Sequence, residues 1–234
     1  QDKNSQDKGI SKFTNDKPLN DKILRDKNSE KKIRFESRFV PIGIDPYAQV
    51  EWTKRDSKIS GTAGESVFEM KDVEVPTEWS QLATDIAVSK YFRRAGVPQT
   101  GHERSVRQLI YRVAHTIREA GSDMDYFTTE TDAQIFEDEL THILLQQKGA
   151  FNSPVWFNCG LYHRYGIEGR GGHFRWDFKT NSIVETSNSF QNPQCSACFI
   201  QSIDDDLMSI FDLVKNEAKI FKFGSGTGTN FSKV

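Results

Sequence analysis

Residues 197–230 read ACFIQSIDDDLMSIFDLVKNEAKIFKFGSGTGTN and join a strand pattern to a helix pattern and a glycine-rich end. The apolar run at 197–200 predicts a short buried strand. A helix is expected over about 206–222, capped by Ser202 or Asp204. Its apolar face would hold Leu207, Ile210, Phe211, Val214, Ala218 and Phe221. A glycine-rich loop over 224–230 is expected to end this helix, so the stretch favours a mixed α/β fold.

Three further helices are predicted upstream from apolar residues at helical spacing. The first covers about 79–94 and is stopped by Gly96 and Pro98. The second begins near Val106, with Gly121 as its terminator. The third spans about 131–148, and Thr129 with Asp132 resembles a capping box. Their apolar stripes are expected to form the core of a small helical domain.

Residues 39–76 are expected to form an irregular entry segment that packs against this helical domain. The segment and the domain together span 39–150. Asp45-Pro46-Tyr47 is a turn signal. Short extended pieces are predicted at 67–70 and 73–75, on either side of Lys71-Asp72.

Residues 1–38 are predicted to be a disordered polar tail. The pair Asp-Lys recurs through this segment, and large apolar residues are sparse and unpatterned. Such a composition cannot bury enough apolar surface to offset the entropy lost on ordering.

The bulk properties exclude several protein classes. With 27% charged residues and a net charge of -2, the chain is not expected to bind nucleic acid. No apolar run approaches the roughly 18 residues of a membrane span, and the polar N-terminus is no secretory signal. Three cysteines in 234 residues do not form a disulfide framework. A reducing cytoplasm is the expected location.

Cys195-Ser196-Ala197-Cys198 is the first candidate for chemistry. A C-x-x-C pair can be a redox dithiol, half of a zinc site, or simply a buried apolar cysteine. Cys159 and the five histidines show no second paired spacing, so a metal site is not expected. The cysteines precede or begin a strand, whereas a thioredoxin-type motif opens a helix.

Two other segments can contact a ligand. Gly224, Gly226 and Gly228 lack the dinucleotide-binding spacing, yet they permit close backbone approach to a phosphate or sugar. A plain helix-ending loop fits equally well. In Asn152-Ser153-Pro154, proline is expected to hold the serine extended, where its hydroxyl could bind phosphate.

Taken together, these segments closely resemble, in order and spacing, adenosylcobalamin-dependent (class II) ribonucleotide reductases. The resemblance is carried by the four stretches 151–159, 193–199, 204–207 and 223–230, and by similar upstream segments from residue 39 onward. It implies that 151–234 is the first part of a ten-stranded α/β catalytic barrel, preceded by the family's N-terminal helical domain.

The resemblance also implies the chemistry. A cobalamin-derived radical generates a cysteine thiyl that abstracts the ribose 3′ hydrogen, and the 2′ hydroxyl leaves as water. Two further cysteines supply the electrons and end as a disulfide, which a dithiol such as thioredoxin reduces. Cys198 matches one of this pair, and its partner cysteine lies outside this chain. Cys195 and Cys159 fall outside the match.

Ligand positions follow from the same resemblance. Ser153 is expected to contact the substrate phosphates, Ala197 and Cys198 the ribose side, and Gly226 the substrate through its backbone. A ribonucleoside diphosphate is the expected substrate. Asp205, Asp206 and Leu207 match the site of a deoxynucleoside triphosphate effector, and helix 206–222 would pack in a dimer interface.

The family's radical cysteine and second redox cysteine have no counterpart in the chain. We therefore expect a complementary chain to carry the rest of the barrel and most of the cobalamin site, and this chain to be inactive alone. A natural split is favoured over a shortened piece. The alternative function is a noncatalytic assembly or regulatory module with a reductase-like fold. A small thioredoxin-like or zinc protein is a third possibility.

Overall fold

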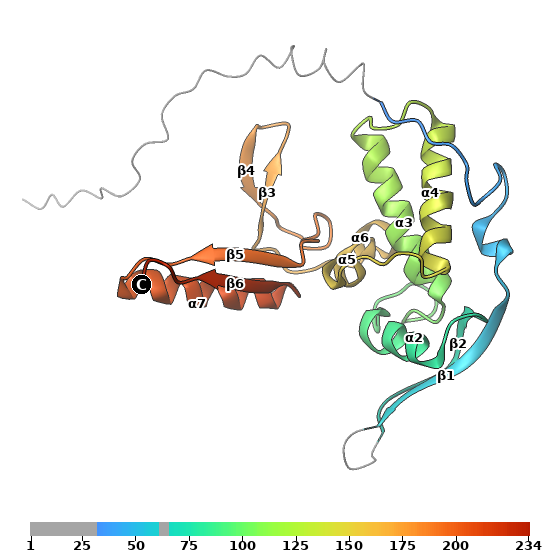
Figure 1. The fold of residues 1–234 in the computed structure, drawn as a ribbon, viewed down its shortest axis with the longest axis horizontal. Helices are drawn as coiled ribbons and strands as arrows, with labels where there is room; N and C mark the ends of the chain where they lie inside the picture. The colour runs from blue at the N-terminus through green and yellow to red at the C-terminus, as the bar shows by residue number, and fades with distance from the viewer. Residues whose placement is uncertain (1–31, 61–65) are drawn as a thin grey trace, which may run out of the picture.

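The computed structural model describes residues 32–60 and 66–234, so residues 1–31 of the predicted tail lie outside the described part. The fold is mixed α/β, as predicted, and consists of a helical body, a long β ribbon, a hairpin and a strand–helix–strand unit (Figure 1). The elements are η1 (Pro46–Gln49), β1 (Trp52–Ser60), β2 (Ser66–Pro76), α2 (Gln81–Ile86), η2 (Ala87–Tyr91), α3 (Val106–Asp123), α4 (Glu130–Leu145), α5 (Ser153–Asn158), α6 (Leu161–Tyr165), β3 (Phe174–Asp177), β4 (Ser182–Glu185), β5 (Cys198–Ser202), α7 (Leu207–Lys222) and β6 (Gly226–Asn230). No helix among the described residues is long and apolar enough to cross a bilayer.

The predicted tail boundary at residue 38 is wrong for residues 32–38, which lie against the helical body. The backbone N–H of Ile33 donates to the Tyr126 carbonyl at 2.7 Å. The Phe35 ring lies 5.3 Å from the Phe136 ring, and its N–H donates to Asp132 Oδ1 at 2.9 Å. Aromatic packing and a carboxylate acceptor on α4 thus offset the ordering entropy that composition alone leaves uncompensated.

The two extended pieces expected at 67–70 and 73–75 form one strand, β2, which pairs antiparallel with β1. The register shifts between Arg55 and Ser57, opposite Lys71-Asp72. Asp72 has φ +54° and donates its N–H to Asp56 Oδ1 at 3.0 Å. The predicted break is therefore a β-bulge inside a continuous ribbon.

The three upstream helices are present, with altered boundaries. The first is the short α2 followed by the π-helical turn η2, which ends at Tyr91 rather than near Arg94. Gly121 does not terminate α3, which continues to Asp123. A Cβ on Gly121 would lie 2.7 Å from the Phe127 ring, so a larger residue there would require this ring to move. The predicted capping box of α4 is confirmed, with Thr129 and Asp132 bonding each other's backbone N–H.

One apolar core joins the helical domain to the start of the predicted barrel region. Its buried members include Val73, Val75, Val106, Leu109, Ile110, Val113, Leu144, Leu145, Val155, Trp156 and Cys159. Helix stripes form this core, as predicted, and α5 packs into the same cluster. Residues 153–159 are thereby anchored to the helical body.

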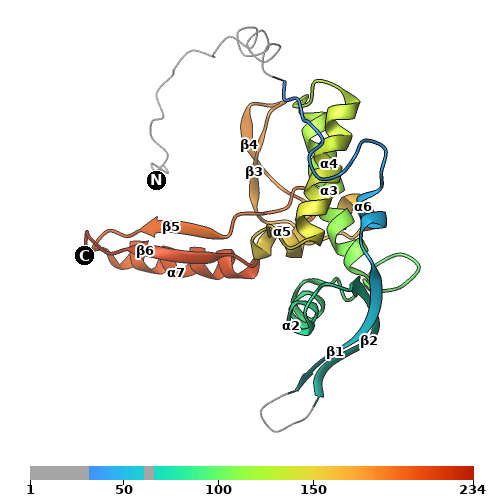
Figure 2. The ribbon, with the colours of Figure 1, turned by 45° about the vertical axis from the view of Figure 1, so that its right-hand side comes forward.

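The glycine-rich segment is not only a loop. Gly224, with φ +83°, follows α7 in the left-handed conformation, and residues 226–230 form strand β6. β6 pairs parallel with β5, in register from Cys198–Gly226 to Ser202–Asn230. The unit β5–α7–β6 projects from the helical body (Figure 2). Two parallel strands joined by a helix are the building block of α/β sheets and barrels.

Candidate functional site

Three of the residues predicted to contact substrate lie together at the start of β5 and β6. Cys198 stands opposite Gly226 in the parallel register. The N–H of Gly226 donates to the carbonyl oxygen of Ala197 at 2.6 Å. A Cβ on Gly226 would lie 3.7 Å from Cys198 Sγ, so the thiol borders the glycine backbone directly.

The Cys198 side chain belongs to the face of the β5–β6 pair that points away from α7. On the helix face, Thr229 Oγ1 donates to Glu217 Oε1 of α7 at 3.3 Å. Because side chains alternate along a strand, Gly226 and Gly228 then fall on the opposite face. Gly228 lies beside Ile200, which is two residues from Cys198 and shares its face.

This open face corrects the prediction of a buried strand at 197–200. Cys198 is exposed and Ile200 is 83% exposed. In the described part of the chain, helix α7 covers only the other side of the two strands. An apolar, thiol-bearing face left open is suited to a second layer of structure or to a ligand.

Hydrogen bonds fix the segment that leads into Cys198. Ser225 Oγ donates to the Ser196 carbonyl at 2.6 Å, and the Gln194 amide donates to the same carbonyl at 3.0 Å. Asn158 Nδ2, at the end of α5, donates to the Gln194 carbonyl at 2.9 Å. These positioning roles of Gln194 and Asn158 were not predicted, although both residues lie within the motifs quoted above.

Ser153 lies at the other end of α5 and is the first helical residue rather than extended. Asn152 takes the extended cap position, and its side chain accepts from the N–H of Val155. The Ser153 hydroxyl is 3.1 Å from the Tyr91 hydroxyl. Proline is tolerated in the first turn of a helix, so Pro154 starts α5 instead of excluding it.

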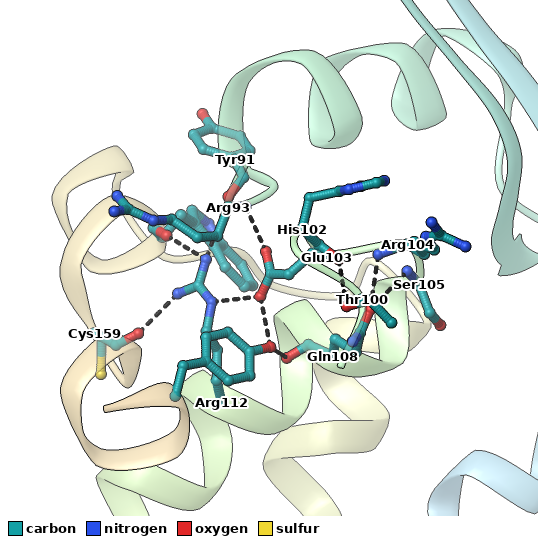
Figure 3. A network of polar contacts seen from close by, with 12 residues as sticks. Tyr91, Arg93, Thr100, His102, Glu103, Arg104, Ser105, Gln108, Arg112 and Cys159 are labelled. Carbon is teal, nitrogen blue, oxygen red and sulfur yellow. Dashed lines mark hydrogen bonds and ion pairs between the residues drawn. The ribbon is translucent and has the colours of Figure 1, made fainter. Parts of the chain in front are cut away.

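A buried ion pair fastens these segments to the helical body (Figure 3). Arg112 Nε lies 2.7 Å from Glu103 Oε1, and the two side chains are 1% and 0% exposed. Arg112 also donates to the Cys159 carbonyl at 2.7 Å and to the Trp156 carbonyl at 2.8 Å. Glu103 accepts from the Tyr165 hydroxyl at 2.9 Å. Burial, and then the charge of Glu103, raise the pKa of Tyr165.

Sequence reasoning missed this network because Arg112 sits in the helical pattern as an ordinary polar residue between apolar ones. Its guanidinium reaches carbonyl groups at the end of α5, 44 and 47 residues away. No local spacing marks such a contact. Buried charged pairs of this kind require full hydrogen bonding, which the network supplies.

The three cysteines are free and differ in their surroundings. Burial raises the pKa of Cys159 to about 12, with a smaller contribution from Cys195. Burial also raises the pKa of Cys195. Cys159 is buried and Cys195 partly buried, whereas Cys198 is exposed. Within residues 32–60 and 66–234 no group of three or more His, Cys, Asp or Glu side chains is placed to hold a metal ion.

The predicted effector residues lie at the start of α7. Asp206, rather than Ser202 or Asp204, caps the helix and accepts from the N–H of Ser209 at 3.0 Å. Asp205 and Leu207 are exposed beside it. Asp205 is thus exposed at the turn, while Asp206 is occupied by capping.

Helix α7 is present over the predicted range, but its predicted apolar face is turned away from the strands. The exposed apolar residues are Leu207, Met208, Ile210, Phe211, Val214 and Phe221. Leu213 is the one buried residue of this helix. A whole apolar stripe is therefore left open to solvent.

Comparisons with known proteins match both regions of the chain. A family model described as class II vitamin B12-dependent ribonucleotide reductase matches residues 53–147, and a ribonucleotide reductase barrel-domain model matches 196–234. A vitamin B12-dependent ribonucleotide reductase of Rhodopirellula baltica is 47% identical over 203 residues, covering 86% of this chain and 20% of the relative. That of Agrobacterium fabrum is 40% identical over 236 residues, covering 86% of this chain and 19% of the relative. A vitamin B12-dependent ribonucleoside-diphosphate reductase of Thermoplasma acidophilum is 40% identical over 58 residues, 25% of this chain and 8% of that protein.

Proposed function

Since this chain belongs to the family of class II vitamin B12-dependent ribonucleotide reductases, we propose that it forms part of an enzyme that reduces ribonucleotides to 2′-deoxyribonucleotides. The chain spans about one-fifth of the length of the relatives it matches. The observation that supports a catalytic role is the pairing of Cys198 with Gly226 on an open strand face.

The unit β5–α7–β6 is proposed to begin a ten-stranded α/β barrel. In such barrels the helices cover the outside and the strand faces opposite them line the interior. The face with Cys198, Ile200, Gly226 and Gly228 would then become the inner wall. A complementary polypeptide region would supply the remaining strands.

Cys198 is proposed to be one of two cysteines that reduce the ribose. When the 2′ hydroxyl leaves as water, the two thiols together give up two electrons and two protons and become one disulfide. The exposed position of Cys198 allows a second sulfur to approach to bonding distance, which buried Cys159 does not. An external dithiol, such as thioredoxin, would then reduce the disulfide by thiol–disulfide exchange.

The substrate is proposed to be a ribonucleoside diphosphate. Gly226 leaves room for close approach to the ribose side, because no Cβ fills the space beside the Cys198 sulfur. Ser153 would donate its hydroxyl to a phosphate oxygen, and its present partner Tyr91 would hold it in place.

Adenosylcobalamin is the proposed cofactor, and it supplies the radical that starts the reaction. The described residues could form only one side of a cofactor site, because the strand face that carries Cys198 is uncovered. Ile200 on the same face is 83% exposed. Most of the cofactor's contacts are assigned to the complementary part. The contribution proposed for this chain is the thiol and the substrate-facing backbone.

Regulation and assembly are proposed to involve α7. Exposed Asp205 would accept a hydrogen bond from the sugar of a deoxynucleoside triphosphate effector, next to Asp206 and Leu207. The exposed apolar stripe of α7 would pack against a second copy in a dimer. A noncatalytic assembly module with the same fold is the alternative function, and it would use these surfaces without using Cys198.

Reconstitution separates the two functions. The chain is combined with the complementary polypeptide, adenosylcobalamin, a ribonucleoside diphosphate and a dithiol, and deoxynucleotide is measured. Cys198→Ser should abolish dithiol-supported turnover, whereas Cys195→Ser in the same motif should retain it. Unchanged turnover in Cys198→Ser would instead favour the assembly module.

A further inference from the structure

A cleft of about 580 Å³ lies where the helical body meets the β5–α7–β6 unit. Its walls come from residues 89–95, from Phe157 and Asn158 of α5, and from residues 221–224 at the end of α7. Ser153, Ala197, Cys198, Gly226, Asp205, Asp206 and Leu207 do not line it, although Gly224 of the glycine-rich segment does. Tyr91, on its wall, bonds Ser153, so the cleft adjoins the proposed phosphate contact without including it.

The cleft is strongly basic. Its lining contains Lys90, Arg93, Arg94, Arg112 and Lys222 and no Asp or Glu. Glu103 neutralises Arg112 at 2.7 Å. In the described part of the chain the other four form no ion pair with a carboxylate, so the cleft attracts anions.

Aromatic rings share the walls with these cations. The Arg93 guanidinium lies 5.5 Å from the Phe190 ring centroid, and Lys222 Nζ lies 5.5 Å from the Phe223 centroid. The rings of Tyr91 and Phe157, which also line the cleft, lie 5.5 Å apart. Cations beside partly exposed rings provide both a phosphate site and a surface on which a planar base can stack.

Two of the cleft arginines, Arg93 and Arg112, influence each other's charge. Burial, and then the nearby charge of Arg112, lower the pKa of Arg93, while Glu103 opposes this effect. A bound anion would relieve this repulsion, because an opposite charge stabilises the ionised guanidinium.

We propose that this cleft binds a nucleotide, with its phosphates among Lys90, Arg93 and Lys222 and its base against the aromatic wall. The site is separate from the substrate and effector positions proposed above and does not depend on them. It would couple ligand binding to the junction between the helical body and the β5–α7–β6 unit.

Binding of ATP to the 234-residue chain, measured by calorimetry, tests the proposal. The double variant Lys90→Glu/Lys222→Glu changes two exposed side chains and should weaken ATP binding by about tenfold or more, because each substitution replaces a cation that attracts phosphate by an anion that repels it. Lys219→Glu, an exposed position on α7 outside the cleft, is the matched control and should bind ATP like the unaltered chain. Inorganic triphosphate and adenosine should each bind more weakly than ATP.

Photolabelling with 8-azido-ATP locates the site. The label is expected in peptides containing Tyr91 or Phe223. Label confined to peptides containing Cys198 or Asp205 would overturn the proposal, because the nucleotide would then occupy the substrate or effector position. Absence of ATP binding, ATP binding unchanged in the double variant, or triphosphate binding as tight as that of ATP would also overturn it.

Discussion

The guanidinium of Arg112 donates to the carbonyl oxygen of Cys159 at 2.7 Å, across 47 residues of sequence. The same side chain pairs with buried Glu103. One arginine of the helical body thus holds the end of α5, whose Asn158 in turn bonds the segment leading to Cys198.

Arg112→Met should destabilise the chain severely, because it leaves the Glu103 carboxylate buried without its counter-charge. Breaking a buried pair by removing one partner costs about 3–5 kcal/mol. Urea denaturation followed by circular dichroism measures the loss. Lys233→Met, which removes an exposed pair with Asp204, is the control and should change the free energy of unfolding by less than about 1 kcal/mol. Equal effects of the two substitutions would show that the network does not stabilise the fold.

Gly226→Ala should fold normally yet impair the reconstituted enzyme. Its Cβ would meet Cys198 Sγ and the Ala197 carbonyl at 3.7 Å, an ordinary contact distance. The added methyl would nevertheless occupy the space proposed for substrate, so turnover should fall by about tenfold or more, corresponding to about 1.4 kcal/mol of lost transition-state binding. Gly160→Ala, in contrast, should impair folding itself. Its Cβ would lie 2.2 Å from the Arg112 carbonyl oxygen, and the residue has φ +79°. Wild-type turnover in Gly226→Ala would contradict the substrate role of this glycine.

Thiol labelling should distinguish the three cysteines by accessibility and pH. Cys198 should react with iodoacetamide in the folded chain, while Cys159 should stay unlabelled until urea is added. Because burial raises the pKa of Cys159 from 9.0 to about 12, the folded state favours the protonated thiol. The stability this contributes is fully present below about pH 9 and is lost as the pH rises towards about 12. Peptide mass spectrometry identifies the labelled residue, and ready labelling of Cys159 at neutral pH would be incompatible with its burial.

Phe211→Asp should weaken self-association through α7. Phe211 is 61% exposed in the centre of the open apolar stripe, so a charge there opposes burial against a second copy. Sedimentation equilibrium of the reconstituted enzyme should show a shift towards the monomeric assembly. Lys219→Glu, on an exposed flank of the same helix, should leave the assembly state unchanged. A dimer that survives Phe211→Asp must use another surface.

Local sequence patterns predicted the positions of helices better than they predicted which faces are exposed. The spacing of apolar residues located α3, α4 and α7, and Thr129 with Asp132 marked the start of α4, because these signals depend on neighbours within one helical turn. The strand at 226–230 was missed because glycine has a low strand propensity, and its pairing with β5 depends on residues 28 positions away. The exposure of Cys198 and of the α7 stripe depends on which layers cover them. No single-segment pattern records that cover.

In the candidate site, too, some contacts were predicted and others were not. The family resemblance assigned Ala197, Cys198 and Gly226 to one substrate site. The parallel register pairs Cys198 with Gly226, and a backbone hydrogen bond joins Gly226 to Ala197. The fastening of α5 by Arg112 and the hydrogen bonds of Gln194 were not expected. Both join side chains to backbone carbonyls far along the sequence, and such contacts leave no periodic trace.

The most direct measurement of the central claim is a single turnover of the reconstituted enzyme without any dithiol reductant, followed by alkylation and mass spectrometry of its cysteines. We expect one disulfide per deoxynucleotide formed, joining Cys198 to a cysteine of the complementary polypeptide, with Cys159 and Cys195 recovered as alkylated thiols. Deoxynucleotide formed while Cys198 remains a free thiol would contradict the assignment.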